Sequence, residues 1–217
     1  DVDGGDWVPV LEESGASIEI PVPEAIDSES YQNELEEVKE AMANMTSNQK
    51  SAIKYWTNNP AIRWNEIALE LIAKYNLIPG PNADGTYTLP NPNNPEGPPA
   101  FPFAHPPYAC RALAYMSVAQ FDGLISAWHH KYEYNRAAPF AVDESIEYAY
   151  EENDMPSYPS DGAVIARASK NILTAMFPLE AQYLQQMEDE HLESLLLSGG
   201  NVMSDITAGT TIGDAVS

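Results

Sequence analysis

A chain of 217 residues with 44% hydrophobic and 10% aromatic residues is long and apolar enough for one globular domain with a full core, which excludes an intrinsically disordered protein. Its 33 acidic and 10 basic residues give a formal net charge of −23, and a field of that sign repels nucleic-acid backbones and anionic lipid surfaces. We therefore expect no nucleic-acid partner, and no apolar stretch is long enough to span a bilayer.

Residues 1–29 are predicted to form an extended, proline-punctuated lead, without the basic and apolar regions of a signal peptide. The residues after this lead, 30–217, are predicted to form one helical domain, because apolar residues recur there at spacings of three and four. This periodicity predicts a first helix over about 30–44. A capping box at 46–49 predicts a second helix over 50–57, and Asn59 followed by Pro60 begins a third.

Residues 76–107 hold 10 of the 18 prolines and many asparagines, which excludes regular structure over most of this Pro/Asn-rich loop. A loop of this length in a compact domain is functional or well anchored. We expect its aromatic residues to pack on the body of the protein or to contact a partner or glycan: Tyr87, Phe101 and Phe103.

Later helices are predicted over about 107–135, 161–177, 179–197 and 204–216, and no run alternates as a strand does. The helix over 107–135 is apolar on more than one face, which indicates a central buried helix. Cys110 lies in this helix, so we expect a buried, unreactive thiol, and a single cysteine allows no internal disulfide. The predicted fold class is all-α.

Three blocks of residues carry a family resemblance: Lys131 with Pro139, the segment 156–160 (Pro-Ser-Tyr-Pro-Ser), and the tail 198–209. In order and spacing they resemble the motif of the type 2 phosphatidic acid phosphatase and vanadium haloperoxidase superfamily, and the resemblance runs from about residue 63 to the C-terminus. It implies a helical bundle in which Lys and Arg neutralise phosphate or vanadate, while two histidines supply covalent and acid–base chemistry.

The chain keeps part of that motif and lacks its catalytic residues. Lys131, Ser160 and Asp205 match, and Arg136 lies two residues before the expected arginine position, which Ala138 occupies. The substitutions affect the anion-binding and catalytic positions of the motif: Asp161 replaces glycine, Gly162 the acid–base histidine, Leu195 the second arginine and Asn201 the other histidine. General acid–base catalysis alone contributes roughly 10²–10⁴-fold, and a carboxylate at position 161 repels an oxyanion. We therefore predict a degenerate pocket, filled by packing or by local hydrogen bonds.

Histidine and acidic clusters offer weaker alternatives. His129 and His130 are possible replacement bases beside Lys131, and we expect one of them to line the pocket. As adjacent helical residues they point about 100° apart, so we do not expect them to chelate a metal. Glu188 and His191 have the spacing of a di-iron ligand pair, but a second copy is missing, which favours a solvated acidic face.

Two groups of oxygen ligands suit Ca²⁺ without matching a calcium loop, and we assign both to turns first: Asp1, Asp3 and Asp6, and Asn82 and Asp84 before Gly85.

The sequence thus predicts a degenerate phosphatase/haloperoxidase-like domain that acts as a structural or interaction module. It would be the non-catalytic half or subunit of a larger, extracytoplasmic protein, since secreted bacterial proteins of this kind can carry a degenerate and an intact copy. Its expected partner is a catalytic homologous domain or copies of itself. One alternative is a working phosphate-ester hydrolase or vanadium-dependent haloperoxidase with a relocated histidine. Vanadate or phosphate is expected as a ligand only under this alternative, and the main prediction includes no cofactor. The other is a secreted binding module that uses loop 76–107.

Overall fold

The computed structural model describes residues 2–57, 59–76, 81–86, 104–150 and 154–217. Every regular element in these ranges is a helix, so the predicted all-α fold class is confirmed. The α-helices, joined by three short 3₁₀ helices (η1, Val2–Asp6; η2, Gly15–Ser17; η3, Pro178–Glu180), are α1 (Glu29–Ala43), α2 (Ser47–Thr57), α3 (Pro60–Tyr75), α4 (Pro106–Tyr134), α5 (Pro139–Val142), α6 (Asp161–Met176), α7 (Ala181–Leu197) and α8 (Met203–Ala215).

The helix starts follow from capping residues in the sequence. The hydroxyl of Ser28 accepts from the backbone of α1, Thr46 and Gln49 form the reciprocal bonds of a capping box before α2, and Asn59 accepts from the first turn of α3. Ser160 caps α6 in the same way. Sequence patterns do not predict α5 or the 3₁₀ turns, since elements of three to five residues carry no periodicity.

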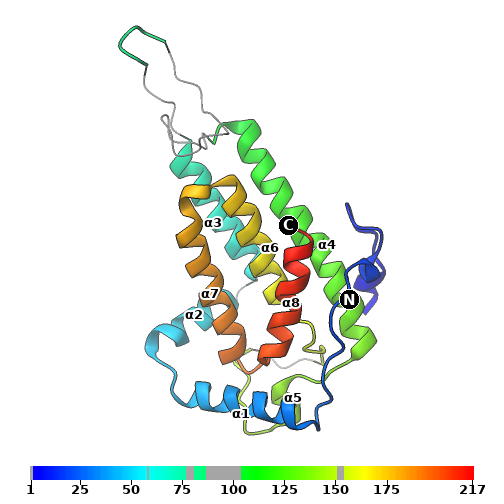
Figure 1. Ribbon diagram of the computed structural model, residues 1–217. Helices are drawn as coiled ribbons and strands as arrows, with labels where there is room; N and C mark the ends of the chain where they lie inside the picture. The colour runs from blue at the N-terminus through cyan, green and yellow to red at the C-terminus, as the bar shows by residue number, and fades with distance from the viewer. Residues whose placement is uncertain (1, 58, 77–80, 87–103, 151–153) are drawn as a thin grey trace.

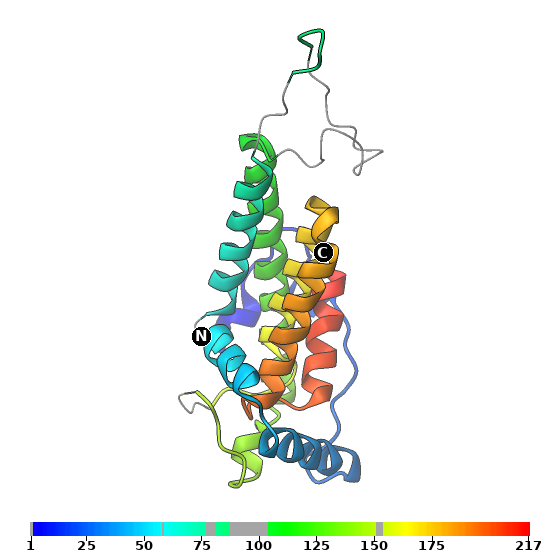
Figure 2. The same ribbon diagram turned by 90° about the vertical axis from the view of Figure 1, so that its left-hand side faces the viewer.

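Five helices run side by side as a bundle, α3, α4, α6, α7 and α8, while α1 and α5 lie across one end (Figures 1 and 2). Helix α6 contacts the other four bundle helices. Close approach of α8 depends on Gly209, where an added Cβ would lie 2.3 Å from the carbonyl oxygen of Ser160. The backbone at the start of α6 is therefore held directly against α8.

The largest apolar cluster fills the space between α2, α3, α4, α6 and α7, and its members include Trp56, Trp64, Tyr108, Met116, Leu173, Phe177 and Leu184. A second cluster seats α1 through Tyr31, Leu35 and Val38, which pack against Ile146 and Val202. The bundle and the helix across its end are thus held by separate parts of the core.

Helix α4 is not buried along its whole length, and the prediction for Cys110 is wrong because this residue is exposed. The first half of α4 lies at the edge of the bundle with one face in solvent, and Tyr115 on that face is 53% exposed. The second half is covered by α6, α8 and the N-terminal segment (residues 2–28). Apolar residues on several faces therefore do not mean burial over the entire helix.

Of the Pro/Asn-rich loop, the structure describes residues 76, 81–86 and 104–107. Asn82 and Gly85 form a hydrogen-bonded turn in which Asp84 accepts from Thr86, and Gly85 has a φ of 80°. The oxygen atoms in this part of the loop thus close a turn. Tyr87, Phe101 and Phe103, the expected contact residues, lie outside the described residues.

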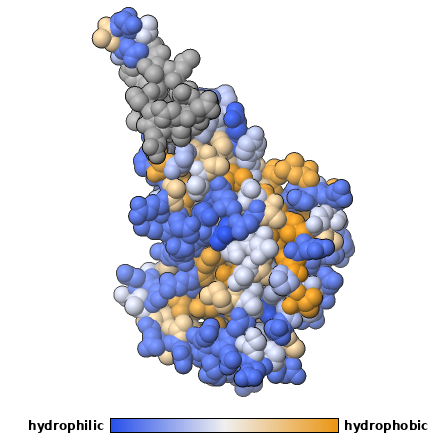
Figure 3. Space-filling view, in the orientation of Figure 1, coloured by the Kyte–Doolittle hydropathy of each residue, from blue (hydrophilic) through white to orange (hydrophobic). Residues whose placement is uncertain are grey.

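The N-terminal segment presents apolar side chains to solvent. Hydrophilic residues cover much of the face shown in Figure 3, and apolar ones gather at the edge where this segment lies. Val8 is 84% exposed and Leu11 is 78% exposed. The buried Asp122 of α4 holds this stretch, because its carboxylate accepts from the backbone N–H of Val10 and of Leu11, each at 2.7 Å. Of the helices that the structure describes, none combines the length and apolarity needed to cross a bilayer.

Candidate functional site

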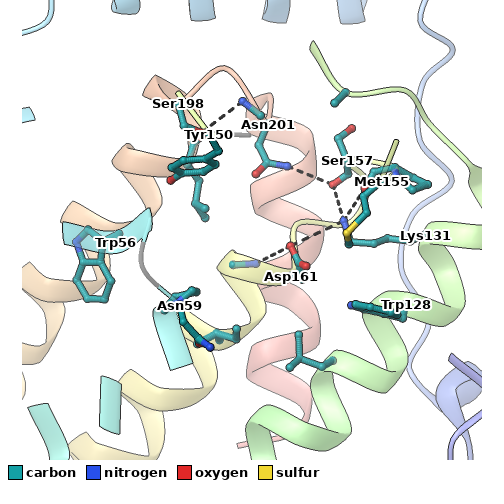
Figure 4. A pocket seen from close by; sticks show the side chains of 18 of the residues that line it. Trp56, Asn59, Trp128, Lys131, Tyr150, Met155, Ser157, Asp161, Ser198 and Asn201 are labelled. Atoms are coloured by element: carbon teal, nitrogen blue, oxygen red, sulfur yellow. Dashed lines mark hydrogen bonds and ion pairs between the residues drawn. The ribbon is translucent and has the colours of Figure 1, made fainter. Parts of the chain in front are cut away.

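A cavity of about 600 Å³ lies among α2, α4, α6, α7 and the segments that follow α5 and α7. Most of its wall is apolar and aromatic, and its polar groups include Lys131, Ser157, Asp161 and Asn201 (Figure 4). The aromatic residues that line it are Trp7, Trp56, Phe121, Trp128, Phe140, Tyr148 and Tyr150. Four of the seven motif residues predicted from the sequence line this cavity: Lys131, Asp161, Gly162 and Asn201.

The ammonium group of Lys131 is already occupied by the protein. Its side chain is 3% exposed, and Nζ donates to the carbonyl oxygens of Pro156 at 2.7 Å and Ser157 at 3.3 Å. The carboxylate of Asp161 lies 3.9 Å from Nζ. A dashed line marks this ion pair in Figure 4. Two of the three ammonium donors thus bond backbone carbonyls, and the Asp161 carboxylate compensates the positive charge of Lys131.

Arg136 is buried behind the cavity and pairs with Asp205. The Nη2 atom of Arg136 donates to Asp205 Oδ1 at 2.5 Å and to Ser204 Oγ at 2.9 Å. The guanidinium packs over the rings of Tyr31 and Tyr158, which accounts for Nε and Nη1 having no hydrogen-bond partner. Burial raises the pKa of each tyrosine to about 12, so both rings stay neutral at physiological pH.

Asp205 is fully buried and fixes the start of α8. Its Oδ2 accepts from the backbone N–H of Val202, and its Oδ1 accepts from Ser157 Oγ at 3.0 Å as well as from Arg136. The motif thus contains two cations, Lys131 and Arg136, each beside a carboxylate, and its formal charge is zero.

The remaining motif residues bond to one another. The hydroxyl of Ser160 lies 3.2 Å from Asn201 Oδ1 and also caps α6, and the Asn201 amide donates to the carbonyl of Ser157 at 3.2 Å. At Gly162 an added Cβ would lie 2.6 Å from a methyl carbon of Leu195, so the side chain of α7 fills the space beside this residue. Hydrogen bonds and packing therefore occupy the motif, while the neighbouring aromatic region remains hollow.

Neither proposed replacement base reaches the cavity, so the expectation that one of them lines it is wrong. His130 is buried on the other side of α4, where its Nε2 lies 2.8 Å from the carbonyl of Ile18. His129 lines a smaller cavity of about 260 Å³ under the N-terminal segment. Lys131 follows them directly in sequence, but the rotation of 100° per helical residue carries its side chain to the opposite side.

The histidine that does line the cavity is His191, which stacks on Trp56 with ring centroids 4.3 Å apart. Its Nδ1 accepts from Trp64 Nε1 at 3.2 Å, so the ring proton is on Nε2, which has no partner. Burial lowers the pKa of His191 to about 3. A neutral ring with an occupied Nδ1 is neither a general acid near neutral pH nor a free nucleophile.

The predicted solvated face at Glu188 and His191 is also wrong, because both side chains are fully buried. Glu188 accepts from Gln185 at 2.9 Å, pairs with Arg167 and lies 3.5 Å from Lys170 Nζ. Arg167 and Lys170 come from α6, so the packing of α7 on α6 compensates the buried negative charge of Glu188. The sequence of α7 alone does not show these partners.

No protein-family model and no curated protein matches the sequence. Among solved structures, the chain is similar to one described as the "first bacterial vanadium dependant iodoperoxidase", with a TM-score of 0.71 and 21% sequence identity over 99% of this chain. The chain has a vanadium haloperoxidase fold. It spans about half the length of the iodoperoxidase chain, 55%.

Vanadate or phosphate does not fit the residues at the motif position of this fold. Binding of such an anion needs uncompensated positive charge at the cavity. Here Asp161 compensates Lys131, and Arg136 is paired with Asp205 and does not line the cavity. All four histidines of the chain are in described residues. His105 caps the far end of α4, His129 and His130 face away from the cavity, and His191 is engaged by Trp64.

Sequence reasoning missed two contributors to the site. Ser157 bonds Asp205 through its side chain and accepts from Lys131 and Asn201 through its carbonyl, and its only signal was its place inside the Pro-Ser-Tyr-Pro-Ser segment. The aromatic wall had no signal at all, because its members come from segments far apart in the chain.

Proposed function

We propose that this chain is a non-catalytic haloperoxidase-fold domain that serves as a structural or interaction module, the degenerate half or subunit of a larger extracytoplasmic protein. The observation that carries the proposal is the internal neutralisation of the motif. Each cation that the resemblance assigns to an oxyanion has a carboxylate of this chain beside it, at 3.9 Å for Lys131 and 2.5 Å for Arg136. An incoming phosphate or vanadate would have to displace these contacts and approach Asp161.

The interaction part of the proposal is supported by the exposed apolar stretch 7–11. Exposed apolar side chains that lie together mark contact surfaces more often than isolated ones do. Here Asp122 fixes the backbone while Val8, Val10 and Leu11 project into solvent, each more than half exposed. We infer that this stretch contacts a second haloperoxidase-type domain, either a catalytic homologue or another copy of the chain.

The catalytic part is tested by calorimetric titration of the purified chain with vanadate and with phosphate, together with assays of iodide oxidation by hydrogen peroxide and of p-nitrophenyl phosphate hydrolysis. We expect no binding and no turnover. Turnover that depends on vanadate, or that disappears on His191→Gln substitution, would replace the proposal by the relocated-histidine alternative.

The interaction part is tested by sedimentation velocity over a range of protein concentrations. The double variant Val8→Ser/Leu11→Ser is compared with the wild-type chain, and Leu69→Ser serves as a control because Leu69 is also exposed, at 48%, but lies on α3. We expect concentration-dependent association of the wild-type chain that the double variant reduces and the control retains. Association that is equal in all three proteins would remove the role of stretch 7–11.

A further inference from the structure

Near the C-terminal end of α4, on the side away from the cavity, two histidines and a glutamate come together. One side-chain nitrogen each from His129 and His130 and one carboxylate oxygen of Glu133 all lie within 4.8 Å of one another. Within the described part of the chain, no other group of three such residues meets this condition. We propose that His129, His130 and Glu133 bind one divalent transition-metal ion of the zinc class.

The geometry differs from the sequence expectation that adjacent histidines cannot chelate. Their side chains do leave the helix in different directions, yet Glu133 follows at i+4 from His129 and i+3 from His130, so its carboxylate lies on the helix surface next to both. The two ring centroids are 5.2 Å apart. The shared carboxylate makes a three-residue site from a pair that would be too divergent alone.

The distances are close to those of a metal site. The carboxylate atom Glu133 Oε2 lies 3.3 Å from His130 Nδ1 and 3.9 Å from His129 Nε2. Ligand atoms about 2.1 Å from a tetrahedral zinc ion are about 3.4 Å apart. The His130 pair already has this spacing, and the His129 pair exceeds it by about 0.5 Å.

The orientation of His130 supports metal binding. A carbonyl oxygen only accepts, so His130 Nε2 carries the proton that it donates to the backbone of Ile18 at 2.8 Å. In the neutral ring with its proton on Nε2, Nδ1 carries a lone pair that faces the Glu133 carboxylate oxygen. Both atoms are then acceptors, and a cation between them would bind to both. Metal-binding histidines commonly donate their other N–H to a carbonyl in this way, which fixes the ring for coordination.

The surroundings favour a cation and leave it accessible. The N-terminal segment packs closely over His129, since an added Cβ at Gly5 would lie 2.5 Å from its backbone, and the small cavity beside it also contains Asp6 and Glu13. Glu133 is 54% exposed and the His129 side chain 33%, so an ion can enter from solvent. Two nitrogen ligands select Zn²⁺ or a similar ion over Ca²⁺ or Mg²⁺, and a fourth position remains for water or a group from a partner.

The test is calorimetric titration of the tag-free, chelator-treated chain with Zn²⁺, followed by Co²⁺ absorption spectroscopy as a report on coordination. We expect one Zn²⁺ per chain, at least tenfold weaker affinity in Glu133→Gln and in His129→Gln, and loss of the Co²⁺ d–d bands in both variants. His105→Asn is the matched control, because it removes a histidine at the other end of α4 while asparagine retains the helix cap.

Glu133→Gln and His129→Gln change solvent-accessible side chains, so we expect both variants to fold. Circular dichroism of each protein checks this. Absence of Zn²⁺ binding to the wild-type chain would overturn the proposal. Affinity that is unchanged in both site variants, or reduced equally in His105→Asn, would also overturn it, because binding would then be unrelated to this cluster.

Discussion

Replacing Asp205 by asparagine tests the conclusion that the motif residues now stabilise the fold. The carboxylate is fully buried and accepts from Arg136, from the Ser157 hydroxyl and from the backbone of Val202. Asparagine has nearly the same size, so the substitution creates no cavity. It removes the negative charge and turns one acceptor atom into a donor, which faces either the guanidinium or the helix N–H.

The expected loss is large because it leaves the Arg136 guanidinium buried without a counter-charge. Removing one partner of a buried ion pair costs about 3–5 kcal/mol of unfolding free energy. For a domain of this length, each kcal/mol corresponds to roughly 2–4 °C in Tm, so Asp205→Asn should lower Tm by about 6–20 °C. Restoring neutrality with Arg136→Met in the same chain should recover part of that loss, since the two residues are coupled.

Urea unfolding followed by circular dichroism at neutral pH measures these changes. Asp214→Asn is the control. Asp214 lies at the end of α8, the helix that also contains Asp205, and it pairs with Arg167 of α6 at 2.9 Å, but it is 52% exposed. We expect this control to cost less than about 1 kcal/mol. A similarly small loss for Asp205→Asn, or a double variant less stable than either single one, would refute the reasoning.

Three further predictions follow from the same geometry. Burial lowers the pKa of His191 to about 3, so below pH 6.5 the ring is protonated in the unfolded chain but stays neutral in the folded chain. The free energy of unfolding should therefore fall by roughly 2 kcal/mol between pH 7 and pH 5. Urea titrations should show a smaller fall for His191→Gln. Asp161→Asn removes the carboxylate beside Lys131, so calorimetry should detect vanadate binding that the wild-type chain does not show, whereas iodide oxidation should remain absent. Gly209→Ala forces α8 away from the carbonyl of Ser160 and should cost about 1–3 kcal/mol or more in thermal unfolding, and an effect below about 0.5 kcal/mol would mean that the two helices separate freely.

The local sequence was sufficient for the helices and for the family likeness. Caps such as Ser28, Asn59 and Ser160 act on the N–H groups of the next turn, so the boundaries of the long helices were predictable to within a few residues. The motif spacing around Lys131 and Ser160 led to the haloperoxidase fold, which the structural comparison supports at 21% identity. Short-range bonding and periodicity need no knowledge of the tertiary structure.

Burial and electrostatic pairing were decided by the tertiary structure. Glu188 and His191 have the sequence context of a solvated acidic face, and only the packing of α7 against α6 buries them beside Arg167. Cys110 has apolar neighbours in sequence but faces solvent, since α4 lies at the edge of the bundle there.

For the motif residues too, residue identities are given by the sequence, whereas charge pairing depends on the tertiary structure. The sequence determined that this chain lacks the two catalytic histidines of the resemblance, whereas the fold alone determined that Asp161 and Asp205 neutralise its remaining cations. Asp205 in α8 and Arg136 in the segment after α4 are 69 residues apart in the chain, yet their side chains are hydrogen-bonded. Interactions at such separations depend on how helices pack, and a linear pattern does not contain that information.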